Sequence, residues 1–512
     1  MSLMGIDVGT TGCKVVAFDE TGAVLAQAGR EYPLLSPHPG WYELDPDQVW
    51  SFVCECLRAV NAELRHDPVT ALSLSSQGEA MAPVTKDGRV LANSPVSSDR
   101  RNSAQTAEME AALGAERIFA LTGQPTSTIY TLPKILWWRD NAPEVIERAW
   151  KFLCYVDFLA FKLGVEPVID YSMAARTLAF DVNRLDWSDE LLAAAGLGRD
   201  QFAKAMPSGE IIGEIQAGLA AELGFRGPVK VVTGGHDQPA GALGAGVLQP
   251  GAAMLAIGTT EALVAVTEKP RRQMLDYHVS CYPHAAPGHF IALSGNQTGG
   301  RLLRWYRDEL GAAERAIAEE TGRDVYDVIV EQTDDAPGEL MLLPYFVGSG
   351  AVFNDPRATG VIIGLSFDSR RADIVRAILE GLTYEQALCI RILNDIGVEI
   401  NQLTAIGGGS RSERWMQIKA DITGLPVSII HTSEAVSLGV AMLAGSATGV
   451  YRSIDEAAAQ LIKRRKTFYP RPDRSAHYQR QLSIYADLYA ALCPLYEAMA
   501  AAATPPPQTP PP

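Results

Sequence analysis

Three short, mainly apolar runs stand at the start of the chain, at residues 4–8, 14–19 and 23–28, and polar or glycine-containing segments separate them. Short apolar runs that are bounded by Gly, Asp and Thr predict β-strands. The segments between these runs, residues 9–12 and 20–22, are long enough only for tight turns. The pattern therefore predicts an antiparallel meander of three strands.

Farther along the chain, strand-like runs alternate with longer helix-like segments. Asp45 and Pro46 suit the start of a helix over residues 47–64, because Asp caps helices and Pro favours their first turn. The run at 69–75 predicts the next strand. Four later runs are typical of buried strands, with the second and third expected to pair as a hairpin: residues 229–233, 252–257, 263–267 and 403–406. This alternation predicts the α/β class.

The C-terminal part of the chain predicts helices followed by a tail. Ser410 with Glu413 three residues later forms a capping box, which predicts a helix over residues 410–423. Residues 474–503 predict one or two helices. The proline-rich residues 505–512 are expected to be extended and disordered.

Composition is typical of a globular protein with more than one domain. The 512 residues suffice for two or three domains, and 47% apolar with 20% charged residues is ordinary for a protein with a sizeable core. The net charge of −16 argues against nucleic acid or an anionic membrane as the main partner. An anionic ligand would therefore need a local group of N–H donors, basic side chains or a metal ion.

Three features of the sequence favour a cytoplasmic protein. Asp7 interrupts the first apolar run, so the start of the chain does not resemble a signal peptide. The most apolar stretch, residues 240–266, contains Glu261 and many glycines, which suits a strand, turn and strand better than a membrane helix. The seven cysteines are scattered and form no zinc motif, so we expect buried, reduced thiols.

The tripeptide Gly-Thr-Thr occurs twice, at residues 9–11 and 258–260, each time directly after a strand-like run. Backbone N–H groups and Thr hydroxyls in such a turn can donate to phosphate oxygens, and Asp7 can help to hold a hydrated cation. The first turn runs into a strand and not a helix, which excludes a Walker loop and a dinucleotide fingerprint. Taken alone, an ordinary hairpin turn is the simpler interpretation.

A third glycine-rich turn, residues 407–409, lies between a predicted strand and a predicted helix. The N-terminus of a helix after such a turn can form an anion or nucleotide cradle. A plain strand-to-helix turn is the alternative.

Short motifs follow one another along the chain at residues 7–11, 40–46 with Trp50, 76–79, 99–101, 133–137, 170–177, 234–238, 258–260 and 407–411. In this order they resemble the FGGY family of carbohydrate and polyol kinases, within the actin-like ATPase superfamily. The resemblance covers residues 4 to about 449. Each motif is modest alone, but the shared order is specific.

The resemblance implies two ribonuclease-H-like (actin-like ATPase) domains, each a mixed five-stranded sheet flanked by helices, with an interdomain cleft. The expected parts are an N-terminal acceptor-binding domain over 1–245, a C-terminal ATP-binding domain over 246–450, a C-terminal helical extension over 451–503 and a disordered Pro-rich tail over 504–512. Closure would bring the γ-phosphate to the acceptor hydroxyl and exclude water. A homodimer or higher homo-oligomer is expected.

On the acceptor side, the resemblance makes Asp237 the catalytic base. An Asp that ends a strand and caps the following helix is the alternative for this residue. The expected substrate-binding residues are Gln77, Glu79, Asp99, Arg100, Asp237 and Gln238. A surface ion pair is the alternative for Asp99 and Arg100, and His236 is expected to be structural or to lie at the edge of the substrate.

On the nucleotide side, the resemblance implies ATP and Mg²⁺. The expected cofactor-binding residues are Asp7, Gly9, Thr10, Thr11, Lys14, Gly258, Thr259, Thr260, Gly300, Arg304, Gly408, Gly409 and Ser410. Asp7 is also the expected outer contact of the metal ion, which would keep several waters. For Gly300 and Arg304, an ordinary packed helix is an equally good account.

These expectations describe an ATP-dependent kinase that transfers the γ-phosphate to a primary hydroxyl of a small sugar or polyol. Position 97 holds Ser where many relatives carry Trp, which suggests an acceptor bulkier than glycerol. A xylulose-type ketopentose or a C4–C5 polyol is favoured, and glycerol is possible. An actin-like ATPase that changes shape without a sugar acceptor is the alternative. A silent sugar sensor ranks last, because Asp237 and both Gly-Thr-Thr turns are present.

Overall fold

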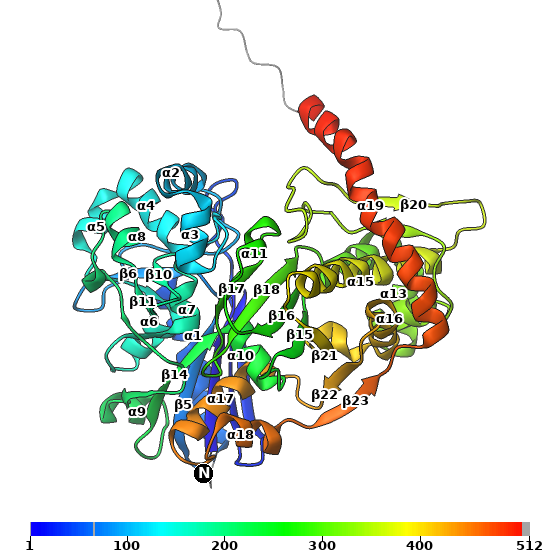
Figure 1. The fold of residues 1–512 in the computed structure, drawn as a ribbon. Helices are drawn as coiled ribbons and strands as arrows, with labels where there is room; N and C mark the ends of the chain where they lie inside the picture. The colour runs from blue at the N-terminus through cyan, green and yellow to red at the C-terminus, as the bar shows by residue number, and fades with distance from the viewer. Residues whose placement is uncertain (1, 65–66, 504–512) are drawn as a thin grey trace, which may run out of the picture. The chain divides into compact units, whose positions relative to one another are not determined.

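The computed structural model describes residues 2–64 and 67–503, and the chain forms two compact units (Figure 1). Unit 1 comprises Met1–Pro250, Val264–Ala292 and His431–Lys463, and unit 2 comprises Gly251–Leu263, Leu293–Ile430 and Arg464–Pro512. The chain contains two mixed sheets flanked by helices, as the motif resemblance implies. The Pro-rich tail expected over 504–512 lies outside the described residues.

The sheet of unit 1 has six strands, in the order β13 (Ile211–Glu214), β14 (Lys230–His236), β5 (Val69–Ser76), β1 (Ser2–Val8), β2 (Gly12–Phe18) and β3 (Val24–Glu31). β1 pairs antiparallel with β2, and β2 with β3, which confirms the predicted meander. β1, β5 and β14 run parallel, with Val8 opposite Ser76 and Ser76 opposite His236. The residues that follow these three strands therefore emerge at one edge of the sheet.

Helices flank this sheet because its central strands, β1 and β5, are buried along almost their whole length. α17 (Ala435–Ala447) packs on β1, β5 and β14 and on α10 (Asp237–Gly244). α1 (Pro46–Glu63) packs on β2 and β3. It begins at Pro46, one residue before the predicted start, and the Asp45 carboxylate caps it by accepting from the N–H groups of Asp47 and Gln48. α6 (Tyr155–Lys162) packs on β5 and β14.

Shorter elements complete unit 1. They are β4 (Glu43–Leu44), β6 (Met81–Val84), β7 (Ser94–Pro95), α2 (Ser103–Leu113), α3 (Ala115–Thr122), α4 (Thr131–Asn141), α5 (Pro143–Arg148), β8 (Lys151–Cys154), β9 (Val168–Asp170), α7 (Tyr171–Ala175), β10 (Phe180–Asp181), β11 (Asp186–Trp187), α8 (Asp189–Ala194), the 3-10 turn Arg199–Gln201, β12 (Lys204–Met206), α9 (Ala217–Glu222), α11 (Gln273–Asp276), β17 (Ser280–Pro283) and α18 (Ile454–Leu461).

The second sheet has seven strands, in the order β17, β18 (Phe290–Asn296), β16 (Glu261–Thr267), β15 (Gly251–Ile257), β21 (Ile400–Ile406), β22 (Val427–Ile430) and β23 (Arg464–Phe468). β15, β21 and β22 run parallel, and β23 is antiparallel to β22. Sheets of six and seven strands correct the expectation of five strands each. The added edge strands were hard to predict because β23 reads Arg-Arg-Lys-Thr-Phe and β13 is half exposed with a register shift at Gly213.

The remaining elements of unit 2 are α12 (Gly300–Trp305), the π-helical turn Tyr306–Leu310, α13 (Ala312–Thr321), α14 (Val325–Glu331), β19 (Met341–Leu343), β20 (Val361–Ile363), α15 (Arg371–Asp395), the 3-10 turn Gly408–Arg411, α16 (Glu413–Thr423) and α19 (Pro472–Ala503). α16 packs on α15, and α19 packs on both. The segment predicted as one or two helices over 474–503 is thus a single helix.

The predicted start of the helix over 410–423 is wrong. α16 begins at Glu413 and is capped by Ser412, whose hydroxyl accepts from the N–H of Trp415. The Ser410 hydroxyl instead donates to the carbonyl oxygen of Gly407 at 2.7 Å, so it has no role as a cap of α16. Only Ser410 fits a capping box in the sequence, but the 3-10 turn over Gly408–Arg411 displaces the start of the helix to the residue after Ser412.

Among the described helices, none is both long and apolar enough to cross a lipid bilayer. All seven cysteines are free thiols, and six of them are buried. The expected buried thiols are therefore found at every position except Cys493, which is partly exposed.

Candidate active site

The carboxyl edge of β1, β5 and β14 brings together candidate residues that are far apart in the sequence. Gly9, Gln77 and Asp237 directly follow the three paired strand ends. The Gln77 side chain donates through Nε2 to the Gly9 carbonyl at 3.3 Å, and its Oε1 accepts from the Thr10 hydroxyl at 2.8 Å. Gln77, expected to contact the substrate, therefore braces the first Gly-Thr-Thr turn.

The first Gly-Thr-Thr turn is held in one shape. The Gly9 N–H donates to the Gly12 carbonyl at 2.9 Å, and the Tyr32 hydroxyl lies 2.6 Å from the Gly9 carbonyl and 3.0 Å from that of Gly12. The carbonyl oxygens of the turn are thus engaged inside the protein, while Thr11 at its tip is exposed. A turn fixed in this way suits the binding of an anion by outward N–H and hydroxyl groups.

Lys14, expected to reach phosphate, already has an anionic partner in unit 1. Its ammonium group lies 2.8 Å from the Glu434 carboxylate, just before α17. Lys14 remains about half exposed, whereas Glu434 is largely covered. A phosphate that binds Lys14 would therefore share the ammonium group with Glu434 or replace it.

Asp7 offers an open acceptor at the end of β1. Its Oδ1 atom is buried and has no hydrogen-bond donor among the described residues. Burial raises the pKa of this carboxyl to about 6, because the charged form loses its water. A hydrated cation would relieve that cost. No cluster of three or more metal-ligating side chains occurs within residues 2–64 and 67–503. The donor set thus fits Mg²⁺ bound through waters and phosphate rather than a cation caged by protein.

Asp237 is the first residue of α10, directly after His236 at the end of β14. Its side chain is 30% exposed, yet its Oδ1 atom is buried and receives no hydrogen bond from the described part of the chain. Burial, and next the charges of Asp7 and Glu79, raise the pKa of this carboxyl to about 7. The helix-cap alternative is not supported, since α10 has no side-chain cap. A reachable carboxyl with this pKa suits a general base.

Gln238 stands next to the base and is also open. Its Oε1 atom is buried without a donor among the residues that the structure describes. Two neighbouring acceptor atoms, on Asp237 and Gln238, therefore lack donors at the same edge of the sheet. A ligand with several hydroxyl groups would supply such donors.

Glu79 is held by a residue that the sequence analysis passed over. It is buried, adopts a positive φ of 69°, and pairs with the buried guanidinium group of Arg176. That guanidinium group lies 5.0 Å from the Tyr130 ring and 5.2 Å from the Tyr282 ring. Arg176 was part of a matching motif, but its partner is 97 positions away, so only the fold reveals the pair.

Asp99 and Arg100 point to different partners. Asp99 is fully buried, accepts from the Tyr42 N–H at 2.7 Å and forms a two-pronged ion pair with Arg101. Arg100 is exposed and donates to the Thr128 hydroxyl at 2.9 Å. The alternative of a surface ion pair between Asp99 and Arg100 is therefore wrong. Arg101 in turn stacks 4.0 Å from the Trp41 ring, so this cluster stiffens the loop.

In unit 2, the second Gly-Thr-Thr turn lies against the start of α12. The Gly300 N–H donates to the Gly258 carbonyl at 2.8 Å, and the Arg301 N–H donates to the Thr259 carbonyl at 3.3 Å. Thr259 and Thr260 are exposed. Arg304 lies on the exposed side of α12. The structure thus places three of the expected nucleotide contacts, Gly258, Thr259 and Gly300, in direct contact.

The third glycine turn adjoins the second. Gly407 has a φ of +85°, and a Cβ atom there would lie 2.6 Å from the carbonyl oxygen of Ile257, the residue before Gly258. At Gly409 a Cβ atom would meet the Ile257 side chain. The turns at 258–260 and 408–410 therefore meet at the carboxyl ends of β15 and β21, where parallel strands commonly bind ligands.

A buried ion pair directly follows the second Gly-Thr-Thr turn and fixes its position. Glu261 follows Thr260, and its carboxylate lies 3.0 Å from the Lys419 ammonium group on α16. Gln386 on α15 donates to the same carboxylate at 3.3 Å. Neither charge was singled out from the sequence, because a lone Glu and a lone Lys 158 positions apart give no local signal.

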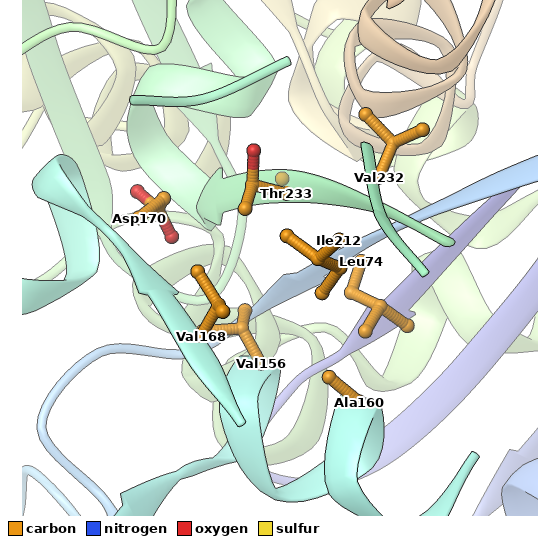
Figure 2. A pocket seen from close by; sticks show the side chains of 9 residues that line it. Leu74, Val156, Ala160, Val168, Asp170, Ile212, Val232 and Thr233 are labelled. Atoms are coloured by element: carbon orange, nitrogen blue, oxygen red, sulfur yellow. The ribbon is translucent and has the colours of Figure 1, made fainter. Parts of the chain in front are cut away.

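A small hollow in unit 1 lies among β5, α6, β9 and β14 (Figure 2). It has an empty volume of about 200 Å³ that includes open solvent, and its lining is Leu74, Val156, Ala160, Val168, Asp170, Ile212, Val232, Thr233 and Gly234. Figure 2 shows mainly apolar side chains, with the Asp170 carboxylate and the Thr233 hydroxyl as the polar groups. None of the expected site residues lines it, so it is separate from the edge that carries Asp237.

Two family domains match the chain almost end to end. The N-terminal domain of the FGGY family of carbohydrate kinases matches residues 2–244, and the C-terminal domain of that family matches residues 253–448. The xylulose kinase of Escherichia coli K12 is 31% identical over 500 residues, covering 96% of this chain and 99% of that protein. The xylulose kinase of Staphylococcus epidermidis ATCC 12228 is 29% identical, covering 95% and 96%.

Comparison with a solved structure gives the same result. The xylulose kinase of Rhodospirillum rubrum superposes with a TM-score of 0.87 at 26% identity, covering 97% of this chain and all of that one. The chain belongs to the FGGY family of carbohydrate kinases and is a phosphotransferase that uses ATP with Mg²⁺ and an alcohol group as acceptor.

Proposed function

We propose that this kinase transfers the γ-phosphate of ATP to a primary hydroxyl of a small sugar, with a xylulose-type ketopentose as the favoured acceptor. The observation that carries the proposal is the reachable carboxyl of Asp237, whose pKa is raised to about 7, beside the buried Gln238 Oε1 atom, which lacks a donor among the described residues. Xylulose kinases among the similar proteins support the choice of acceptor. A C4–C5 polyol or glycerol would present the same type of hydroxyl group.

In the proposed reaction, Asp237 accepts the proton of the acceptor hydroxyl. The acceptor oxygen forms a bond to the γ-phosphorus, the bond from that phosphorus to the bridging oxygen breaks, and ADP leaves. A base is useful here only if it is ionised before the reaction and can hold a proton afterwards. The raised pKa of Asp237, about 7, meets both conditions near neutral pH.

For the acceptor, we propose that Gln238 and Glu79 receive hydroxyl groups beside the base and that Arg100 borders the site. Arg176 keeps Glu79 in place through their buried ion pair, which suits a carboxylate that receives hydroxyl hydrogens. Gln77 and Asp99 support the site indirectly. Gln77 accepts from the Thr10 hydroxyl in the first turn, and Asp99 accepts from the Tyr42 N–H in a neighbouring loop. Ser97, two residues before Asp99, is partly exposed. Its small side chain would leave more space for an acceptor than a Trp side chain at this position.

For the nucleotide, we propose that the exposed turns of unit 2 and the first turn of unit 1 hold the phosphates. The unit 2 residues are Gly258, Thr259, Thr260, Gly300, Arg304, Gly408, Gly409 and Ser410, and the unit 1 residues are Gly9, Thr10, Thr11 and Lys14. Asp7 would orient waters of Mg²⁺, whose charge neutralises the phosphate oxygens. The interdomain cleft and the domain limits at 245, 450 and 503 remain predictions.

The acceptor dependence of ADP release tests the proposal. Purified protein with Mg-ATP is offered ketopentoses, aldonates and C3–C6 polyols, and ADP is measured against a sample without acceptor. We expect one acceptor class to raise ADP release strongly, and its phosphorylated product to appear in equal amount. In the Asp237→Asn variant, kcat should fall by about 10²–10⁴-fold while ATP still binds.

The alternative hypothesis, an actin-like ATPase without a sugar acceptor, predicts a different result in the ADP-release assay. Steady ADP release that no acceptor changes, in wild type, would contradict the sugar kinase and favour an ATPase that works without a sugar. Full activity in Asp237→Asn together with strong acceptor dependence would keep the kinase but remove Asp237 as its base.

We further propose a cytoplasmic enzyme that forms a homodimer or higher homo-oligomer. Free, mostly buried thiols support a reducing compartment. Exposed apolar side chains on the arm formed by β19, β20 and their flanking residues support self-association: Phe346, Val347, Ile363, Leu365 and Phe367. Phe367 is fully exposed, which is unusual for a large apolar side chain outside an interface.

A further inference from the structure

His236 contacts the proposed base on one side and a tyrosine on the other. The residue is 4% exposed and ends β14, directly before Asp237. Its Nδ1 atom lies 2.8 Å from the hydroxyl of Tyr282 on β17. Its Nε2 atom lies 3.0 Å from Asp237 Oδ1. A single imidazole ring thus joins a buried phenol to the carboxylate on which the proposed chemistry depends.

We propose that His236, oriented by Tyr282, is a positioning residue that holds the Asp237 carboxylate with its other oxygen toward the acceptor hydroxyl. This inference rests on the proposed role of Asp237 as the base. It replaces the expectation that His236 is only structural or lies at the edge of the substrate. His236 itself takes no proton from the substrate.

The hydrogen-bond partners assign the tautomer of the ring. Nε2 faces the Asp237 carboxylate at 3.0 Å, so the ring hydrogen belongs on Nε2, and Nδ1 then accepts from the Tyr282 O–H. In the other tautomer, the Nε2 lone pair would face an ionised carboxylate, which is repulsive. Burial, and next the charge of Arg176, lower the pKa of His236 well below its usual value, so the ring is neutral.

The contact with Asp237 is close but not yet a good hydrogen bond. The two atoms are 3.0 Å apart, although Oδ1 has no hydrogen bond of acceptable geometry from the described residues. The inference therefore requires that the carboxylate turn when an acceptor binds, so that Oδ1 accepts the Nε2 hydrogen. Because Oδ1 is buried while the side chain is 30% exposed, Oδ2 is left to receive the proton.

The protein fixes the place of His236 from several directions. The His236 N–H donates to the Ser172 hydroxyl at 3.0 Å, and that hydroxyl donates to the Asp170 carboxylate at 2.5 Å. Figure 2 shows that carboxylate at the side of the hollow. Gly78 leaves room for the ring, since a Cβ atom there would lie 2.9 Å from His236 Nε2. A ring held this firmly can transmit orientation to its neighbour.

The test compares three substitutions with a matched control. His236→Leu removes both ring nitrogens, His236→Gln keeps an N–H donor near the Nε2 position, and Tyr282→Phe removes only the hydroxyl. His284→Gln is the control, because His284 is equally buried in unit 1 but contacts the carbonyl oxygen of Val247. For each protein, kcat, both KM values and the thermal midpoint are measured with the best acceptor of the panel.

A positioning role predicts losses in kcat at nearly constant KM. We expect His236→Leu to lower kcat about a hundredfold, Tyr282→Phe about tenfold, and His236→Gln to recover about tenfold relative to Leu. Both KM values should stay within about threefold, because neither substrate touches His236 directly. His284→Gln should keep the wild-type kcat.

Two results would overturn the inference. One is a full kcat in His236→Leu with only a lower thermal midpoint, which a purely structural histidine predicts. If His236→Leu does not fold, a full kcat in Tyr282→Phe, which keeps the ring packed against Arg176, overturns it instead. A wild-type protein without acceptor-dependent activity would refute the proposed function before any variant is compared, so the two failures are distinct.

Discussion

At the scale of single residues, the chemistry depends on polar atoms that the fold buries and leaves open. Asp7 Oδ1 and Gln238 Oε1 are both of this kind within the described chain. A buried acceptor without a donor costs free energy, roughly 1–3 kcal/mol for a neutral group. Such a cost persists in a protein when a ligand relieves it, and we expect the bound acceptor and a hydrated cation to do so here.

The pKa of Asp237 predicts how activity depends on pH. A base must be ionised, so kcat/KM should rise as pH increases through about 7 and reach a plateau above it. Below that value, kcat/KM should fall about tenfold per pH unit. The measurement is an acceptor-dependent initial rate between about pH 5 and about pH 8, with protein stability checked at each end. A flat profile over this range would show that Asp237 is not the titrating base.

Which residues of the site could be predicted depended on whether their signal is local. Asp237, Asp7 and the Gly-Thr-Thr turns stand at strand ends beside glycines, a pattern that a short stretch of sequence displays. Arg176, Tyr282 and Glu434 carry no such pattern. Each acts through a partner that only the fold supplies; Lys14 and Glu434, for example, are 420 positions apart.

At the scale of elements, strand pairing and glycine turns build both halves of the proposed site. The apolar runs predicted the central strands, since buried strands must be apolar. They missed the edge strands β13 and β23, whose pairing depends on a neighbour and not on their own apolar content. The start of α16 was misplaced for a similar reason, because the 3-10 turn before it follows from the contact of Gly407 with Ile257.

Two glycines in unit 2 allow a comparison of two effects of substitution by Ala: a steric clash with a neighbouring backbone, and strain from a positive φ alone. Gly407 and Gly424 have φ values of +85° and +71°, but a Cβ atom would strike the Ile257 carbonyl only at Gly407. Gly424→Ala should therefore cost about 1–2 kcal/mol of unfolding free energy and leave the KM for ATP unchanged. Gly407→Ala should cost more and raise that KM about tenfold, because the turn must move. Denaturant unfolding and ATP kinetics measure both. Equal effects of the two variants would rule out a nucleotide role for this turn.

At the scale of the whole molecule, the exposed apolar arm predicts self-association. Phe367→Ser combined with Leu365→Ser should convert the proposed oligomer to a monomer, because both side chains are more than half exposed and would be covered in an interface. Light scattering during size-exclusion chromatography measures the mass. Ile211→Ser on the edge strand β13 of unit 1 is the control and should leave the mass unchanged. A wild-type monomer, or an oligomer that survives the double substitution, would contradict the prediction.

The threading of the chain has a consequence for its biosynthesis. α17 covers β1 and β5, and Leu438 and Leu443 share a core with Leu3 near the start of the chain. A ribosome makes the chain from its N-terminus, so the first sheet is complete long before its covering helix emerges. The apolar surface of this sheet therefore stays uncovered while the ribosome synthesises most of unit 2. We therefore expect the nascent chain to bind a chaperone that shields apolar surface. The N-terminal half should leave that chaperone only when translation is nearly complete and α17 can cover the sheet.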